Sequence, residues 1–229
     1  MNLEELKCFL ETPKKLLSMD KEKLTLLFDS DFAMMKGYSQ DNPHHCYDLL
    51  EHTVHTLDVI NCDGLSEDDT LELKIAALYH DVGKPKVAFE KNGKTVFYNH
   101  ATESRRIAAK ELRKFDLDND VLDRILFYVE YHDAFISFKL PSEIRDKRNS
   151  FINPIEKETV NSKINSIQKK CVAKKIYVPM HKDFILLLRL CLADVEAQSS
   201  EVFQNGVLID SKKMKVKRLK TIRDLIEFN

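Results

Sequence analysis

The chain has 229 residues, of which 43% are hydrophobic, enough for one sizeable core; this composition excludes a disordered protein. Lys and Arg number 36 against 37 Asp and Glu, and this formal charge of −1 argues against a protein that attracts polyanions by its overall charge. Only five glycines and six prolines interrupt the chain, which favours a mostly helical fold.

The N-terminal part predicts helices on both sides of a loop. Two short helices are expected at 3–11 and about 19–30, followed by the turn-rich segment 37–45 with the sequence GYSQDNPHH. A longer helix is expected from about Cys46 to Ile60, because apolar residues recur there with a helical period.

A second helix is predicted over 66–81, where Ser66 and Asp69 form a capping-box-like start. Gly83 and the proline at 85 end it, and we interpret Gly83 as the residue that lets the chain turn away. Alternating apolar and polar residues around Asn92-Gly93 then predict a hairpin within 86–98, expected to be the only β structure.

Further helices are predicted at 100–115, 118–133, 182–198 and 211–228, whereas three prolines break the stretch 139–180. We therefore expect an all-α bundle of roughly eight or nine helices with one small β-hairpin. We divide it into an N-terminal helical extension at 1–40, a main domain at 41–205 and a C-terminal basic helix at 206–229.

Several polar residues fall where buried residues are expected. His80 and Asp81 end an apolar helix; taken alone, the pair could be a core histidine and a solvent-facing carboxylate. However, His52 and His132 also border apolar faces, and Asp194 lies in the very apolar stretch LLLRLCLADVEA. A buried carboxylate needs a cation, and Arg189, five residues from Asp194, lies off the same helical face, so a divalent metal is the better partner.

The order His52, His80-Asp81, Asp194 resembles the H…HD…D ligand set of the HD superfamily of metal-dependent phosphohydrolases. A mixed nitrogen and oxygen site of this kind suits Mn, Fe, Co, Ni, Zn or Mg without choosing sharply among them. The resemblance implies one or two ions per chain. His100 and His132 would complete a second site bridged by Asp81, or they would instead contact the substrate phosphate.

Longer stretches resemble the HD part of bacterial CCA-adding tRNA nucleotidyltransferases, from about residue 1 to 228. They are QDNPHHCYDLLEHTVHTLD, LKIAALYHDVGKP, FYNHATESRRIAAKELRKF and LLLRLCLADVEAQ. The 40 residues before this part have one glycine and no room for a nucleotidyltransferase head, so we expect that the chain does not add CCA.

Other residues are weaker candidates. Lys84 could stabilise charge on a phosphate, as a catalytic and substrate-binding group, or simply neutralise Asp81. Arg105 could bind phosphate or belong to a solvated helix face, and His45 could line the pocket or have only a loop role. The seven basic residues between 212 and 223 could contact RNA or form a solvated face.

The resemblance implies a phosphomonoesterase or 2′,3′-cyclic phosphodiesterase that acts on a nucleotide, an RNA-end phosphate or another phosphorylated small molecule. Asp81 and Lys84 would carry the reaction. The alternative is a non-catalytic tRNA- or protein-binding HD module.

Features of the whole chain indicate its compartment. Five scattered cysteines without a CxxC pair predict reduced thiols. No signal peptide and no run of about 18 apolar residues is present. We therefore expect a cytoplasmic protein without membrane contact, and the sequence leaves its oligomeric state open.

Overall fold

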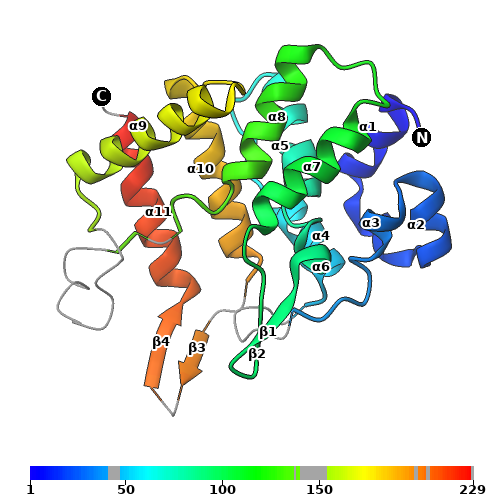
Figure 1. The fold of residues 1–229 in the computed structure, drawn as a ribbon, viewed down its shortest axis with the longest axis horizontal. Helices are drawn as coiled ribbons and strands as arrows, with labels where there is room; N and C mark the ends of the chain where they lie inside the picture. The colour runs from blue at the N-terminus through cyan, green and yellow to red at the C-terminus, as the bar shows by residue number, and fades with distance from the viewer. Residues whose placement is uncertain (41–46, 137, 140–153, 199–200, 205–206, 228–229) are drawn as a thin grey trace.

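The computed structural model describes residues 1–40, 47–136, 138–139, 154–198, 201–204 and 207–227. Within these residues the chain forms eleven α-helices, one 3-10 helix (η1) and two hairpins (Figure 1). The helices are α1 (Leu3–Glu11), η1 (Pro13–Ser18), α2 (Lys21–Leu27), α3 (Ser30–Ala33), α4 (Leu49–Val59), α5 (Glu67–Tyr79), α6 (Lys84–Val87), α7 (His100–Leu112), α8 (Asn119–Tyr131), α9 (Lys157–Lys174), α10 (His181–Glu196) and α11 (Lys212–Glu227). The strands are β1 (Phe89–Lys91), β2 (Lys94–Val96), β3 (Glu201–Gln204) and β4 (Val207–Ser211). The mostly helical fold is as expected, with more helices than eight or nine because α3 and α6 are only four residues long.

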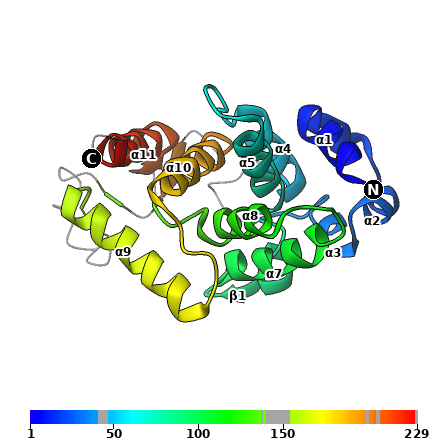
Figure 2. The same ribbon diagram turned by 90° about the horizontal axis from the view of Figure 1, so that it is seen from above.

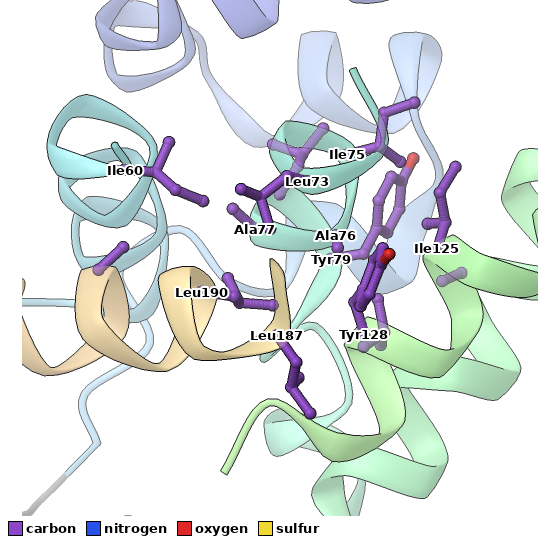
Figure 3. Packing of buried hydrophobic residues seen from close by; sticks show 14 of the residues in the cluster. Ile60, Leu73, Ile75, Ala76, Ala77, Tyr79, Ile125, Tyr128, Leu187 and Leu190 are labelled. Atoms are coloured by element: carbon purple, nitrogen blue, oxygen red, sulfur yellow. The ribbon is translucent and has the colours of Figure 1, made fainter. Parts of the chain in front are cut away.

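Helix α5 lies in the middle of the bundle, where it packs against α4, α8 and α10 (Figure 2). Its second half is almost entirely buried. Figure 3 shows Tyr79 of α5 beside Ile125 and Tyr128 of α8, with Leu187 and Leu190 of α10 reaching toward the same core. Because each fully buried apolar side chain of this size contributes about 1.5–3 kcal/mol, this core fixes the positions of the helix ends around it.

Local signals explain where the two central helices begin. The Asp48 side chain accepts a hydrogen bond from the Glu51 amide, and the Glu51 carboxylate accepts one from the Asp48 amide, which forms a capping box at the start of α4. Ser66 accepts from the Asp69 amide at 3.1 Å, and acidic residues fill the first turn of α5, where the helix dipole favours them. The predicted helix at 66–81 is thus confirmed with its start at the expected cap.

The hairpin predicted within 86–98 is confirmed as the antiparallel pair β1 and β2. Asn92 and Gly93 both have positive φ, 54° and 71°, as the tight hairpin turn requires. A second antiparallel hairpin, β3 with β4, corrects the expectation that the first would be the only β structure. The sequence carries the same Asn-Gly dipeptide at 205–206, so the signal was present there as well.

The second hairpin also changes the C-terminal segment. Residues 207–211 form strand β4, so the basic helix expected over 206–229 covers Lys212–Glu227. Helix α11 packs along α10 and also contacts α9 (Figure 1). At the other end of the bundle, η1 contacts α4 and α1 contacts α5. No helix in the described residues is long and apolar enough to cross a membrane.

Candidate metal centre

Six of the polar side chains singled out in the sequence converge at one place in the bundle. Their potential ligand atoms form two groups, and within each group these atoms lie within 4.8 Å of one another. The first group is His52, His80 and Asp194, and the second is Asp81, His100 and His132. Five of the six residues are buried and His100 is half-buried.

Five helices deliver these side chains. His52 lies within α4 and Asp194 near the end of α10, while His80 caps the C-terminus of α5 and is followed directly by Asp81. His100 is the first residue of α7, and the remaining histidine caps the C-terminus of α8. The side chains at the ends of α5, α7 and α8 thus meet those of α4 and α10, which pass beside these ends.

Backbone carbonyls set the orientation of three of the histidines. His80 Nδ1 lies 2.8 Å from the Ala77 carbonyl oxygen, and His132 Nδ1 lies 2.8 Å from that of Val129. His100 Nδ1 makes the same contact, at 3.0 Å, with the carbonyl of the residue three positions earlier. Because a carbonyl only accepts, each Nδ1 carries a proton, and in the neutral ring each Nε2 therefore keeps its lone pair. This is the tautomer that a metal-ligating histidine needs.

The lone pairs of these histidines face other acceptors. The Nε2 atoms of His100 and His132 are 3.2 Å apart. His80 Nε2 is buried without a hydrogen-bond partner in the described residues, although it lies 3.2 Å from Asp81 Oδ2. Acceptors that approach one another in a buried place need a proton or a cation between them.

Asp81 lies between the two groups. Its Oδ2 atom is 3.2 Å from His80 Nε2 and 3.7 Å from His52 Nε2, and so faces the first group. Its Oδ1 atom is 3.3 Å from His100 Nε2 and 3.5 Å from His132 Nε2, and so belongs to the second. One carboxylate therefore presents one oxygen to each group.

Both buried aspartates are held in the charged form. Burial alone would raise the pKa of the Asp81 carboxyl, but Lys84 and His80 offset it and hold this pKa well below its usual range. Burial would likewise raise the pKa of Asp194, but the hydrogen bond and charge of His52, whose Nε2 lies 3.0 Å from Asp194 Oδ1, hold it well below the usual range. Burial opposes the protonation of His80, and Asp81 reverses this so that the pKa of His80 is raised.

The other candidates from the sequence are placed as follows. Lys84 is buried, and its Nζ lies 2.6 Å from Asp81 Oδ2, beside the two groups. Arg105 Nε lies 3.1 Å from Glu130 Oε2, so its charge is balanced by a carboxylate of α8. His45 lies outside the described residues.

Two glutamines and a lysine near the centre were not expected from the sequence. Gln198 Nε2 donates to Asp194 Oδ1 at 3.3 Å, and Lys215 of α11 donates to Gln198 Oε1 at 2.8 Å. Gln40 Oε1 accepts from Lys84 Nζ at 2.8 Å. The sequence could have indicated Gln198, because a residue four positions after Asp194 lies on the same face of a helix. Gln40 lies in a loop, where helical spacing predicts no neighbour.

Gly83 is needed for space rather than for a turn. Its φ of −80° is open to any residue, so the turn itself does not require glycine, which corrects the interpretation that Gly83 is what lets the chain turn away. A Cβ at this position would lie 2.4 Å from the Ser104 amide nitrogen and 2.7 Å from the His100 carbonyl oxygen. The Gly83 amide also donates to Ser104 Oγ at 2.9 Å. The turn after Asp81 is thus pressed against the first turn of α7.

The donor set fits a divalent metal. Imidazole nitrogens and carboxylate oxygens are the ligands that first-row divalent ions accept, and the two groups offer both. The lone pairs that face one another, and the carboxylate with one oxygen toward each group, give cations a place in each. Two buried His/Asp groups in this chain could therefore bind metal ions.

Comparisons with known proteins agree with this geometry. Residues 45–159, half of the chain, match the HD domain family. The chain is also 29% identical over 154 residues to the CC-adding tRNA nucleotidyltransferase of Thermus thermophilus. That similarity covers 65% of this chain but spans only about a third, 34%, of the relative's length. Asp194 lies beyond the matched HD segment, and only the fold brings it to the centre. The chain belongs to the HD domain family.

Proposed function

We propose that this protein is a metal-dependent phosphohydrolase, either a phosphomonoesterase or a 2′,3′-cyclic phosphodiesterase. The observation that carries the proposal is the position of Asp81, whose two carboxylate oxygens face different groups of buried histidine nitrogens. A carboxylate in this position suits a centre of two ions that share one ligand. The HD domain implies a phosphorylated substrate.

We assign the metal ligands accordingly. The first ion would be held by His52, His80 and Asp194, and the second by His100 and His132, with Asp81 between them. A bound divalent ion would supply a water molecule of lowered pKa and would polarise the phosphoryl oxygen. The identity of the metal, among Mn, Fe, Co, Ni, Mg and Zn, is not selected by these ligand types.

The protein's own groups position the substrate and balance its charge. Asp81 holds its negative charge between the two groups, and Lys84 places an ammonium 2.6 Å from its Oδ2. In this buried place the ammonium can also stabilise negative charge that develops on a phosphoryl group. Of the two other substrate-binding candidates, Arg105 would have to exchange Glu130 for the phosphate, and His45 stays a proposal from the sequence.

The substrate that we propose is a nucleotide or an RNA-end phosphate. Support comes from the similarity to a tRNA nucleotidyltransferase and from the basic helix α11. We retain the division into a helical extension (1–40), the HD domain (41–205) and a C-terminal basic segment (206–229) as a proposal. RNA would then contact the last of these.

The test combines metal analysis with a turnover screen. Purified protein is analysed by inductively coupled plasma mass spectrometry and then assayed with each metal. The substrates are p-nitrophenyl phosphate, bis(p-nitrophenyl) phosphate, 2′,3′-cyclic AMP and nucleoside monophosphates. Asp81→Ala should lose both metal and turnover while circular dichroism still shows a helical fold.

Asp133→Ala is the matched control, because Asp133 follows a histidine as Asp81 does but is exposed. It should keep metal and turnover. Wild-type metal content in Asp81→Ala would overturn the assignment. Tight binding of tRNA by a chain that turns over no phosphate ester with any metal would instead favour a non-catalytic binding module.

A further inference from the structure

Gln40 is a buried polar side chain next to the metal centre, and the function proposed above gives it no role. It is 2% exposed, and its Oε1 accepts from Lys84 Nζ at 2.8 Å. Lys84 Nζ in turn lies 2.6 Å from Asp81 Oδ2. Gln40 is therefore linked to the Asp81 carboxylate through a single ammonium group.

The contact with Lys84 settles which way the Gln40 amide points. An ammonium has three donors and no acceptor, so only the amide oxygen can face it. The amide nitrogen must then point away from Lys84. The oxygen and nitrogen of a glutamine amide have nearly the same shape and can be interchanged. Here the Lys84 ammonium, which can only donate, fixes which of the two faces it.

The amide nitrogen of Gln40 is buried and has no hydrogen-bond partner in the described residues. Nearly all buried donors in folded proteins are hydrogen-bonded, because leaving one unpaired is costly. Here the unpaired N–H groups belong to the same amide whose oxygen accepts from Lys84, beside the metal centre. A donor held in this state is suited to an acceptor that comes from outside the protein.

The neighbouring groups indicate the chemistry of that acceptor. The Lys84 ammonium bonds the oxygen of the same amide whose nitrogen is unpaired, so the two donors are close enough to donate to different atoms of one small group. Phosphoryl groups carry several negatively charged acceptor oxygens within a short distance and suit paired donors of this kind. The ring of Phe97, with its centroid 5.7 Å from Lys84 Nζ, adds an aromatic face beside these donors.

We propose that Gln40 is a substrate-binding residue whose amide nitrogen donates a hydrogen bond to a phosphoryl oxygen of the substrate. This inference rests on the proposed phosphohydrolase function and adds a ligand that the metal-binding residues do not supply. Gln40 also fixes Lys84, but the hydrogen bond that its nitrogen donates to the substrate is a separate contribution. The two contributions can be separated.

A double-mutant cycle makes the separation. Inorganic phosphate is titrated calorimetrically into Mn²⁺-loaded wild type, Gln40→Met, Lys84→Met and the double variant. Gln40→Met removes the donor at nearly constant volume, so it should weaken phosphate binding by about 10- to 100-fold, the loss expected for a hydrogen bond to a charged group. A loss should persist in the Lys84→Met background, where Gln40 has no lysine to position, although residues in contact need not be fully additive.

Gln168→Met is the matched control, since Gln168 Nε2 donates to the Pro179 carbonyl at 2.9 Å outside the centre. It should leave phosphate affinity unchanged. Metal content and melting temperature are measured for every variant. If Gln40→Met fails to fold or to hold metal, Gln40→Glu replaces it, because its carboxylate keeps an acceptor for Lys84 and still lacks the donor.

Two results would overturn the inference. One is a Gln40→Met effect that vanishes in the Lys84→Met background, which would make Gln40 only a support for the lysine. The other is a wild-type chain with bound Mn²⁺ that shows no phosphate binding. A chain that binds phosphate through Gln40 but hydrolyses no ester would instead refute the proposed function, while the contact between Gln40 and phosphate would stand.

Discussion

Replacing Gly83 with alanine tests how closely the HD turn and α7 are packed. The added Cβ would lie 2.4 Å from the Ser104 nitrogen, and an ordinary contact begins at 3.4 Å, so the two segments must separate by about 1.0 Å. The clashing atoms are backbone atoms that cannot rotate aside. Overpacking of this kind costs about 1–3 kcal/mol, which for a chain of this size lowers the melting temperature by roughly 3–10 °C.

The displacement of α7 should also change the second group of potential ligands, Asp81, His100 and His132. His100 begins α7, and its Nε2 lies 3.3 Å from Asp81 Oδ1. A shift of the first turn by about 1 Å changes that distance by a similar amount, and a metal site tolerates far less. We therefore expect Gly83→Ala to reduce metal content from two ions per chain toward one.

The assay is thermal unfolding by calorimetry, combined with metal analysis of the same samples. Gly64→Ala is the control, because Gly64 has a φ of +74° and no atom within 4 Å of an added Cβ. It should lose about 1–2 kcal/mol through backbone strain and keep all of its metal. Gly83→Ala with an unchanged melting temperature and full metal content would refute the close packing of this turn.

Three further predictions concern the ions themselves. Asp194→Asn keeps the shape of the side chain but removes a negative ligand, so metal analysis should show the first ion lost and the second kept; full metal and activity would make the carboxylate structural. His100→Ala and His132→Ala should each lower metal content from two toward one and reduce turnover by orders of magnitude. If both variants keep their metal and lose only about 10²- to 10⁴-fold in rate, these histidines act on the phosphate instead. Removal of metal with a chelator should lower the melting temperature by roughly 5–10 °C, because an ion present at about 100 times its Kd stabilises the fold by about 2.7 kcal/mol. Added metal should restore it, whereas an unchanged melting temperature would mean that no ion binds the folded chain.

The sequence alone was sufficient to predict the helices that carry the residues of the metal centre. The start of α5 follows from Ser66 and the acidic residues after it, and its course from the apolar period, because caps and helical periodicity are local interactions. The hairpin at Asn92-Gly93 is local in the same way. The adjacency of His80 and Asp81 is covalent, so any fold that buries one of them places the other nearby.

The tertiary structure decided how these residues meet. The sequence could not show that Asp81 presents Oδ2 to one group and Oδ1 to the other, because this depends on where α4, α7 and α8 cross the end of α5. Gln40, more than forty positions before Lys84, has no periodic relation to it, and only the packing of its loop brings their side chains together.

Gly83 shows the same division between local and tertiary causes. The sequence marks it as a break after the helix and suggests a local reason, a turn of the chain. Its backbone is ordinary, however, and the need for glycine comes from the α7 backbone that lies against it. Local sequence determines where helices begin and end, whereas close approaches between segments distant along the chain exist only once the core has brought those segments together.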